Sequence, residues 1–243
     1  MKILYLSIAV WPSWEEARKK MWVWFRSVDR FTHGFRYFGV GTPQFPGYRG
    51  MKIEAPLNWL MAHELHEYTH IFYTDSADCL MLATPKEIEF KYTMLGTPPI
   101  LLSAFNQLGN VSDGNRYPIF NTPEHRAKNG VYCYPNVGGF IMETPLLYDY
   151  LHRAHADFPD CGDDCFIMYD LIQSGWMRPE LDHHCHIWQV QNLENSEIAE
   201  SRVHNLVTDS WPCVLHVSGG YTDQVTLKDH AMVPLAEQLG ILP

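Results

Sequence analysis

Short apolar runs alternate with helix-forming segments along the first half of this 243-residue chain. The first run covers residues 2–8, and Ser13 with Glu16 three residues later has the spacing of a capping box at a helix start. Further apolar runs cover residues 35–40, 70–74 and 99–104. Between them we expect helices at 52–66, beginning near Pro56, and at 85–95. This alternation predicts an α/β fold with a mostly parallel central sheet and flanking helices.

The second half of the chain is less regular. A polar, turn-rich stretch covers residues 106–129. The elements expected after it are an apolar run at 137–142, helices at 145–155 and 163–173, and short strands at 186–190 and 213–217. We find no internal repeat, low-complexity tract or linker. We therefore predict a single domain over residues 1–243.

Charge and composition limit the classes of function. The chain has 18 lysine and arginine residues against 28 aspartate and glutamate residues, a formal net charge of −10 at pH 7. A general, non-specific DNA coat is therefore disfavoured, and binding of nucleic acid requires a local basic patch. No segment has the pattern of a membrane span or a secretory leader, so we expect a cytoplasmic protein without a membrane partner. The six cysteines are scattered, and free thiols are expected.

Asp75 and Asp78 are the first candidate functional residues. They follow the apolar run 70–74 directly, and an open α/β sheet places its ligand crevice at the carboxyl ends of its strands. Two carboxylates at that edge can share Mg²⁺ or Mn²⁺, and such an ion can neutralise a diphosphate leaving group. The alternative is an Asp-rich turn that caps a helix, and the spacing alone favours neither.

Asp163, Asp164 and His216 are weaker candidates. The two aspartates open an expected helix, where capping explains them and contact with an acceptor hydroxyl or a sugar is the functional alternative. His216 ends an apolar run just before a glycine-rich turn, where a neutral imidazole can complete a metal site. A structural role is the alternative for His216, which gains interest only together with Asp75 and Asp78.

Other motifs are rejected. Gly39 and Gly41 lack later glycines at the offsets of a dinucleotide-binding fingerprint, and the P-loop pattern is absent. The segment 183–186, with Cys161 and Cys165, contains residues that bind zinc, but the gaps match no common zinc module. We expect segment 183–186 to lie along a strand, which points alternate side chains to opposite faces. A structural role is therefore favoured for these residues.

Five segments, taken in order, resemble the glycosyltransferase domain of collagen lysyl hydroxylases and the related collagen galactosyltransferases. Tyr-Thr-Asp-Ser-Ala-Asp resembles the family's manganese and nucleotide motif, and Asn-Val-Gly-Gly-Phe-Ile is similar to its Asn-Ser-Gly-Gly-Phe-Ile. The segment Gly-Asp-Asp-Cys-Phe at 162–166 resembles the family's helix start, which reads Asp-Asp-Gln-Leu-Phe. Two further segments are similar to the family's Leu-Asp-His strand and its late histidine motif. The five segments cover residues 73–78, 134–141, 162–166, 181–189 and 212–220.

The resemblance implies a GT-A fold with a nucleotide-binding N-terminal half and an acceptor-binding C-terminal half. It implies that Mn²⁺, or Mg²⁺, binds the diphosphate of a UDP-sugar and that the anomeric configuration is retained. The metal ligands implied are Asp75, Asp78 and His216. The residues implied to contact the nucleotide are Ala9 and Val10 at the uracil, Lys52, Ser76 within the metal motif, and the backbone of Gly219 at the diphosphate.

The resemblance also places Asp163 and Asp164 toward the acceptor or the sugar, as candidate catalytic residues, and assigns no nucleophile. It disfavours zinc at 183–186, because the family keeps that strand without a metal. Phe105 stands where the family tends to have glutamate, and Val217 with Ser218 replaces glycine and asparagine.

The acceptor is a separate hypothesis. Phages use small glycosyltransferases to modify their genomes, so our first hypothesis is hexose transfer to a 5-hydroxymethylpyrimidine in viral DNA. A hydroxylysine-type or small hydroxylated acceptor is the first alternative, and an inactive nucleotide-sugar-binding module is the second. The DNA hypothesis requires a local basic face, and the N-terminal fifth concentrates positive charge. The basic residues there are Arg18, Lys19, Lys20, Arg26, Arg30, Arg36 and Arg49.

Overall fold

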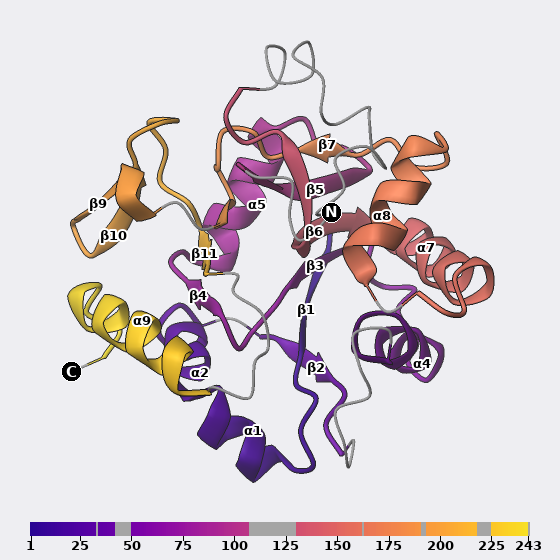
Figure 1. Ribbon diagram of the computed structural model, residues 1–243, viewed down its shortest axis with the longest axis horizontal. Coiled ribbons are helices and arrows are strands. Elements are labelled where there is room, and N and C mark those ends of the chain that lie inside the picture. The colour runs from indigo at the N-terminus through magenta and orange to yellow at the C-terminus, as the bar shows by residue number, and fades with distance from the viewer. Residues whose placement is uncertain are drawn as a thin grey trace.

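A six-stranded sheet forms the centre of the computed structural model (Figure 1). In spatial order its strands are β2 (Arg36–Phe38), β1 (Ile3–Ile8), β3 (His70–Thr74), β6 (Tyr134–Glu143), β5 (Ile100–Phe105) and β7 (Glu180–Leu181). Only β6 runs against the others, so five of these strands share one direction. The expected α/β fold with a mostly parallel sheet is confirmed. The structure describes residues 1–32, 34–41, 50–106, 130–161, 163–190, 193–217 and 225–242, and only the backbone of 225–231.

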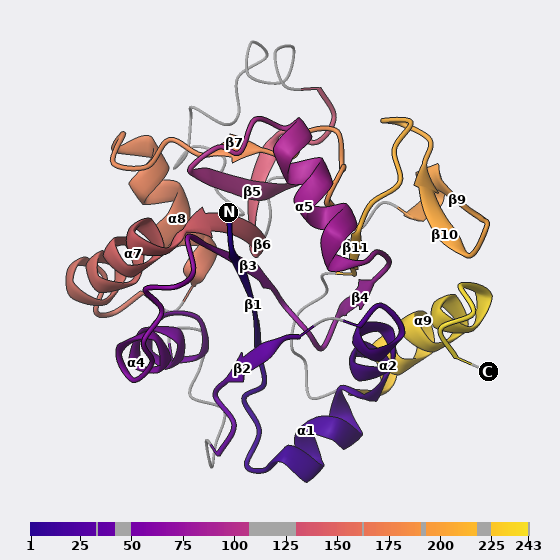
Figure 2. The ribbon, with the colours of Figure 1, turned by 180° about the vertical axis from the view of Figure 1, so that it is seen from behind.

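Helices flank the sheet on both sides, as Figures 1 and 2 show from opposite directions. On one side lie α4 (Ala55–Met61), α7 (Thr144–Asp157) and α8 (Asp164–Gln173). On the other side lie α1 (Trp14–Lys20), α2 (Trp22–Arg30), α5 (Pro85–Met94) and α9 (Val225–Gln238). Among the described helices, none combines the length and the apolar character needed to cross a membrane.

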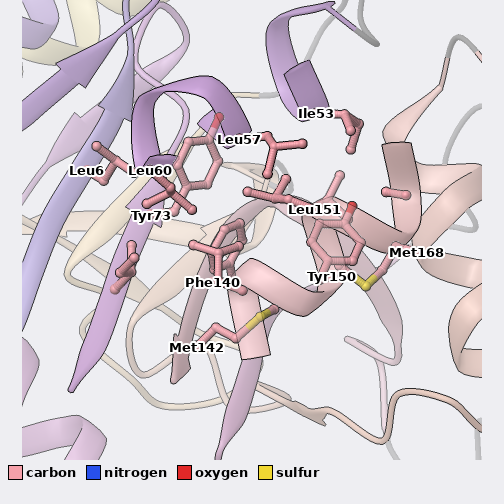
Figure 3. Close-up of a cluster of buried hydrophobic side chains, with 14 of the residues drawn as sticks. Leu6, Ile53, Leu57, Leu60, Tyr73, Phe140, Met142, Tyr150, Leu151 and Met168 are labelled. Atoms are coloured by element: carbon pink, nitrogen blue, oxygen red, sulfur yellow. The ribbon is translucent and has the colours of Figure 1, made fainter. Parts of the chain in front are cut away.

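The two faces of β1 explain why helices cover both sides. Leu4 and Leu6 point into a core with α4, α7 and α8, and Figure 3 shows Leu6 there beside Tyr73 and Phe140. The alternate residues Ile3 and Tyr5 point into a second core with the other helices. Because successive strand residues face opposite sides, a strand buried on both faces reads as a continuous apolar run. This is the run that the sequence shows at residues 2–8.

Local signals place most helix starts. The Ser13 hydroxyl accepts a hydrogen bond from the Glu16 amide at 3.2 Å, as the capping-box spacing predicts. Most of the strands and helices expected from the sequence are present, with ends shifted by a few residues. The helix expected at 52–66 differs, because a π-helical turn covers Gly50–Glu54 and α4 ends at Met61. The expected turn-rich stretch 106–129 lies almost wholly outside the described residues.

Two smaller sheets complete the fold. One contains β4 (Cys79–Met81), β11 (Val214–His216) and β8 (Trp188–Val190), with β11 antiparallel to β4 and parallel to β8. The other is a hairpin of β9 (Ser196–Ala199) and β10 (Arg202–Asn205), preceded by the 3₁₀ turn Leu193–Asn195. The sequence predicted β8 and β11, whereas β4, the hairpin and α9 were not predicted. The sheet containing β11 matters most, because it places His216.

Candidate active site

The candidate site lies at the carboxyl end of β3. Asp75 is the first residue after that strand, and its backbone N–H donates to the Gly138 carbonyl of β6 at 2.8 Å. The turn that follows is closed by the Cys79 amide, which donates to the Ser76 carbonyl at 3.2 Å. The Ser76 hydroxyl is buried and donates to the Ile8 carbonyl at the end of β1. The turn that carries both aspartates is therefore tied to two neighbouring strands.

His216 reaches this turn through the small sheet. In the antiparallel pair of β11 and β4, His216 stands opposite Cys79, and the Val217 amide donates to the Asp78 carbonyl at 2.8 Å. His216 Nε2 then lies 3.7 Å from Asp78 Oδ1 and 3.9 Å from Asp75 Oδ2. The structure thus brings together the three side chains that the sequence singled out, although His216 is far from the aspartates along the chain.

A bulge in β6 shapes the space beside His216. The register between β5 and β6 shifts between Leu102 and Ser103, and the Val-Gly-Gly segment at 137–139 lies inside that shift. A Cβ atom at Gly138 would overlap the His216 ring, lying 2.7 Å from its Nδ1. A Cβ atom at Gly139 would lie 2.5 Å from Nε1 of Trp188. Glycine is required at both positions because these rings pack directly on the backbone.

Lys52 lies between the carboxylates of Asp75 and Asp164, on the other side of the site from His216. Its ammonium group forms an ion pair with Asp75 Oδ1, lies 3.2 Å from the Tyr73 hydroxyl and lies 4.0 Å from Asp164 Oδ2. The Tyr73 hydroxyl also donates to Asp75 Oδ1 at 2.5 Å. Burial disfavours the charge on Lys52, but these neighbours outweigh it and hold the Lys52 pKa well above its ordinary value. The Lys52 charge therefore fixes one oxygen of Asp75 and leaves the other facing His216.

Asp163 and Asp164 have different surroundings. Asp163 is the N-cap of α8, and its carboxylate accepts from the Cys165 amide at 2.8 Å. Asp164 is buried beside Lys52 and lines a cavity of about 30 Å³ between the sheet and the helices. Burial raises the pKa of Asp164 to about 6, against the attraction of Lys52. The capping interpretation thus explains Asp163, while Asp164 retains a titratable carboxyl group near the candidate site.

Three other residues were expected to bind the nucleotide: Ala9, Val10 and Gly219. Ala9 and Val10 are buried immediately after β1, and the Ala9 amide donates to the Phe38 carbonyl at 2.9 Å. Val10 lies against Gly39, which has a φ of +89°. Gly219 lies outside the described residues.

The donor set fits a divalent cation. Ligand atoms from Asp78, Cys79 and His216 all lie within 4.8 Å of one another, and Asp75 Oδ2 faces the same imidazole. His216 is 3% exposed, and among the described residues its Nδ1 has no hydrogen-bond partner. Carboxylate groups suit Mn²⁺ and Mg²⁺, and imidazole is a common ligand of divalent metal ions. Burial raises the pKa of the Cys79 thiol well above its ordinary value, so its proton leaves only when a cation binds the sulfur.

The expectation that segment 183–186 follows a strand is wrong. The buried Asp182 carboxylate accepts three backbone N–H bonds, from His186, Ile187 and Trp188, at 2.7–2.9 Å. These bonds hold a turn in which Cys185 has a φ of +51°, and β8 begins only at Trp188. No group of three metal-binding side chains is found in this segment among the described residues.

Comparisons with known proteins identify the fold. No protein-family model matches the chain. The chain is 23% identical over 210 residues to procollagen-lysine,2-oxoglutarate 5-dioxygenase 1 of Bos taurus, a match that covers 80% of this chain. It covers 27% of that protein, so the chain spans about a quarter of the length of its curated relative. A glycosyltransferase involved in glycosylating the major capsid of PBCV-1 superposes with a TM-score of 0.54 and 14% identity, covering 96% of this chain and 100% of that chain.

The chain has a GT-A glycosyltransferase fold. The resemblance to lysyl hydroxylases that the motifs indicated is confirmed by the curated match. The sequence did not reveal how this GT-A chain holds its site residues in place. Lys52 was expected near a nucleotide, not paired with Asp75, and the packing of Gly138 on His216 was not foreseen. The paired glycines were a usable signal, because adjacent glycines in an apolar strand indicate close approach of another group.

Proposed function

We propose that this protein is a metal-dependent glycosyltransferase that transfers a hexose from a UDP-sugar to a hydroxyl group. The observation that carries the proposal is the meeting of Asp75, Asp78 and His216 at the carboxyl edge of a GT-A sheet. Ligands of α/β proteins bind at this edge. The resemblance to lysyl hydroxylases supports the same assignment.

Each residue of the site has a role in this proposal. Asp75, Asp78 and His216 would hold Mn²⁺, which supplies positive charge to the diphosphate leaving group. Lys52 holds Asp75 in place, and its charge favours a diphosphate nearby. The backbone of Gly219 would also contact the diphosphate, and the backbone after β1, at Ala9 and Val10, would contact the uracil.

Ser76 contributes by fixing the metal-binding turn, because its hydroxyl is bonded to the Ile8 carbonyl. Asp164 is the candidate catalytic residue. Its buried carboxyl group is ionised above a pH of about 6 and would orient the acceptor hydroxyl or the sugar. Asp163 shapes the same corner as the N-cap of α8. We assign no nucleophile, and the transfer would retain configuration as in the related enzymes.

For the acceptor we propose a 5-hydroxymethylpyrimidine in DNA. The support is that α1 and α2 expose basic and aromatic side chains, along with the acidic Glu15, Glu16 and Asp29. The basic residues are Arg18, Lys19 and Arg26, and the aromatic residues are Trp14 and Trp22. Arginine and lysine bind phosphates, and exposed aromatic rings stack on unpaired bases. Hydroxylysine-type or small hydroxylated acceptors are the second candidate, supported by the curated match to a lysyl hydroxylase.

The first experiment measures release of UDP from UDP-glucose and UDP-galactose with and without Mn²⁺. We expect Mn²⁺-dependent release by the wild-type protein and its loss in Asp75→Asn, because that variant loses one carboxylate charge. Asp29→Asn, an exposed position on α2, is the matched control. Absence of metal-dependent UDP release from every nucleotide sugar tested would favour an inactive binding module instead.

The acceptor is tested with labelled donor sugar. Hydroxymethylated DNA and hydroxylysine peptides are offered in the same reaction, with unmodified DNA as the control. The DNA proposal predicts label in hydroxymethylated DNA alone. Label in the peptide alone contradicts the DNA proposal and supports the hydroxylysine alternative.

A further inference from the structure

Cys79 lies in the candidate metal site but has no role in the function proposed above. It stands directly opposite His216 in the β4–β11 pair, and directly opposed residues of antiparallel strands project from the same face of a sheet. Its sulfur atom, an Asp78 oxygen and a His216 nitrogen lie within 4.8 Å of one another. All three side chains are largely buried, with Cys79 fully inaccessible. The thiol is therefore held within reach of the same imidazole that faces Asp75.

The three ligand atoms have the composition of a site for a softer cation. Thiolate, imidazole and carboxylate groups together favour Zn²⁺, whereas Mn²⁺ prefers oxygen ligands. Ligand atoms around a tetrahedral zinc ion lie about 3.5 Å apart, given bond lengths of about 2.0–2.3 Å. The distance of 3.7 Å between His216 Nε2 and Asp78 Oδ1 is close to that value. The sulfur also accepts a hydrogen bond from the Thr74 hydroxyl at 3.6 Å, a contact that would orient a metal-bound thiolate.

We propose that Asp78, Cys79 and His216 form a second, thiophilic ligand set that binds Zn²⁺ or Cd²⁺ in place of Mn²⁺. On binding, the sulfur–metal bond forms as the Cys79 thiol proton leaves to solvent, and no electron is transferred. Asp78 and His216 belong to both ligand sets, so the two kinds of cation exclude each other. The prediction that Zn²⁺ or Cd²⁺ excludes Mn²⁺ rests on the metal site of the proposed function. The prediction that the Cys79 sulfur binds Zn²⁺ or Cd²⁺ does not.

Cadmium reports the sulfur bond directly, through the ultraviolet charge-transfer absorption of a cadmium–thiolate bond. The purified full chain is titrated with CdCl₂ alone, without nucleotide or acceptor. We expect a band that saturates at one equivalent in the wild-type protein and is lost in Cys79→Ser. Cys213→Ser is the matched control, because Cys213 is equally buried, next to β11, but outside the cluster. Cys79→Ala provides a second variant, and circular dichroism shows which variants are folded.

Competition is measured by electron paramagnetic resonance of free and bound Mn²⁺ while ZnCl₂ is added. In Cys79→Ser we expect about tenfold more Zn²⁺ to be needed to release Mn²⁺ than in the wild-type protein. A cadmium band that is missing from the wild-type protein, or that persists in folded Cys79→Ser, overturns the proposal. Asp75→Asn separates the two proposals, because it should weaken Mn²⁺ binding and leave the cadmium band intact. A wild-type protein that shows the band but binds no Mn²⁺ contradicts the proposed function alone.

Discussion

Replacing Gly138 with alanine tests whether the bulge in β6 sets the position of the His216 imidazole. The added Cβ atom would overlap the His216 ring, at 2.7 Å from Nδ1, whereas ordinary contacts of a Cβ atom begin near 3.4 Å. The contact with Cε1 of the same ring is shorter still, so the imidazole or the bulge must move by more than about 0.7 Å. The Gly138 carbonyl also accepts a hydrogen bond from the Asp75 N–H. Movement of the backbone at Gly138 therefore displaces Asp75, a second candidate ligand.

The expected effect on metal binding follows from this displacement. Metal ligands tolerate changes of about 0.2 Å in distance, and disturbing the groups that orient a ligand weakens metal affinity by about 10- to 100-fold. We therefore expect Gly138→Ala to weaken Mn²⁺ binding by that factor. Overpacking of a close contact also lowers the free energy of unfolding, by about 1–3 kcal/mol.

Mn²⁺ affinity is measured by electron paramagnetic resonance, and stability is measured separately by urea unfolding. Gly34→Ala is the matched control, because a Cβ atom there meets nothing within 4 Å and the backbone is not left-handed. We expect the control to change neither quantity by more than the error of measurement. A folded Gly138→Ala protein that binds Mn²⁺ as tightly as the wild-type protein would refute the reasoning.

Three further predictions concern buried charges, two of them at the site and one in the turn before β8. Lys52→Met leaves the Asp75 carboxylate without its cation and should lower the free energy of unfolding by about 3–5 kcal/mol, with Mn²⁺ restoring more stability to the variant than to the wild-type protein in urea titrations. Asp164 has a pKa raised from 3.8 to about 6, so the folded state holds its proton more tightly than the unfolded state does. The contribution of Asp164 to the free energy of unfolding should therefore fall by up to about 3 kcal/mol as the pH rises from 4 to 6. Asp164→Asn should remove that fall, as measured by unfolding curves recorded across this pH range. Asp182→Ala removes the acceptor of three buried N–H bonds and should lower the melting temperature more than Asp29→Ala does, as measured by differential scanning calorimetry.

Local patterns in the sequence determined the main layers of this protein. The apolar run at 2–8 predicted a strand, and the Ser13 capping box predicted the helix after it, because each signal depends on neighbours within a few residues. The position of Asp75 at the end of a strand likewise identified the edge of the sheet where the candidate site lies.

Contacts between distant segments were decided only by the tertiary structure. Cys79 and His216 face each other because β4 and β11 pair, and a three-residue strand such as β4 carries too little pattern to predict its partner. The same holds for Gly138, whose role depends on a shift in register against β5. Strand pairing and bulges depend on long-range packing and hydrogen bonding, which spacing along the chain does not encode. The sequence therefore supplied the ligands, and the fold alone set the distances between them.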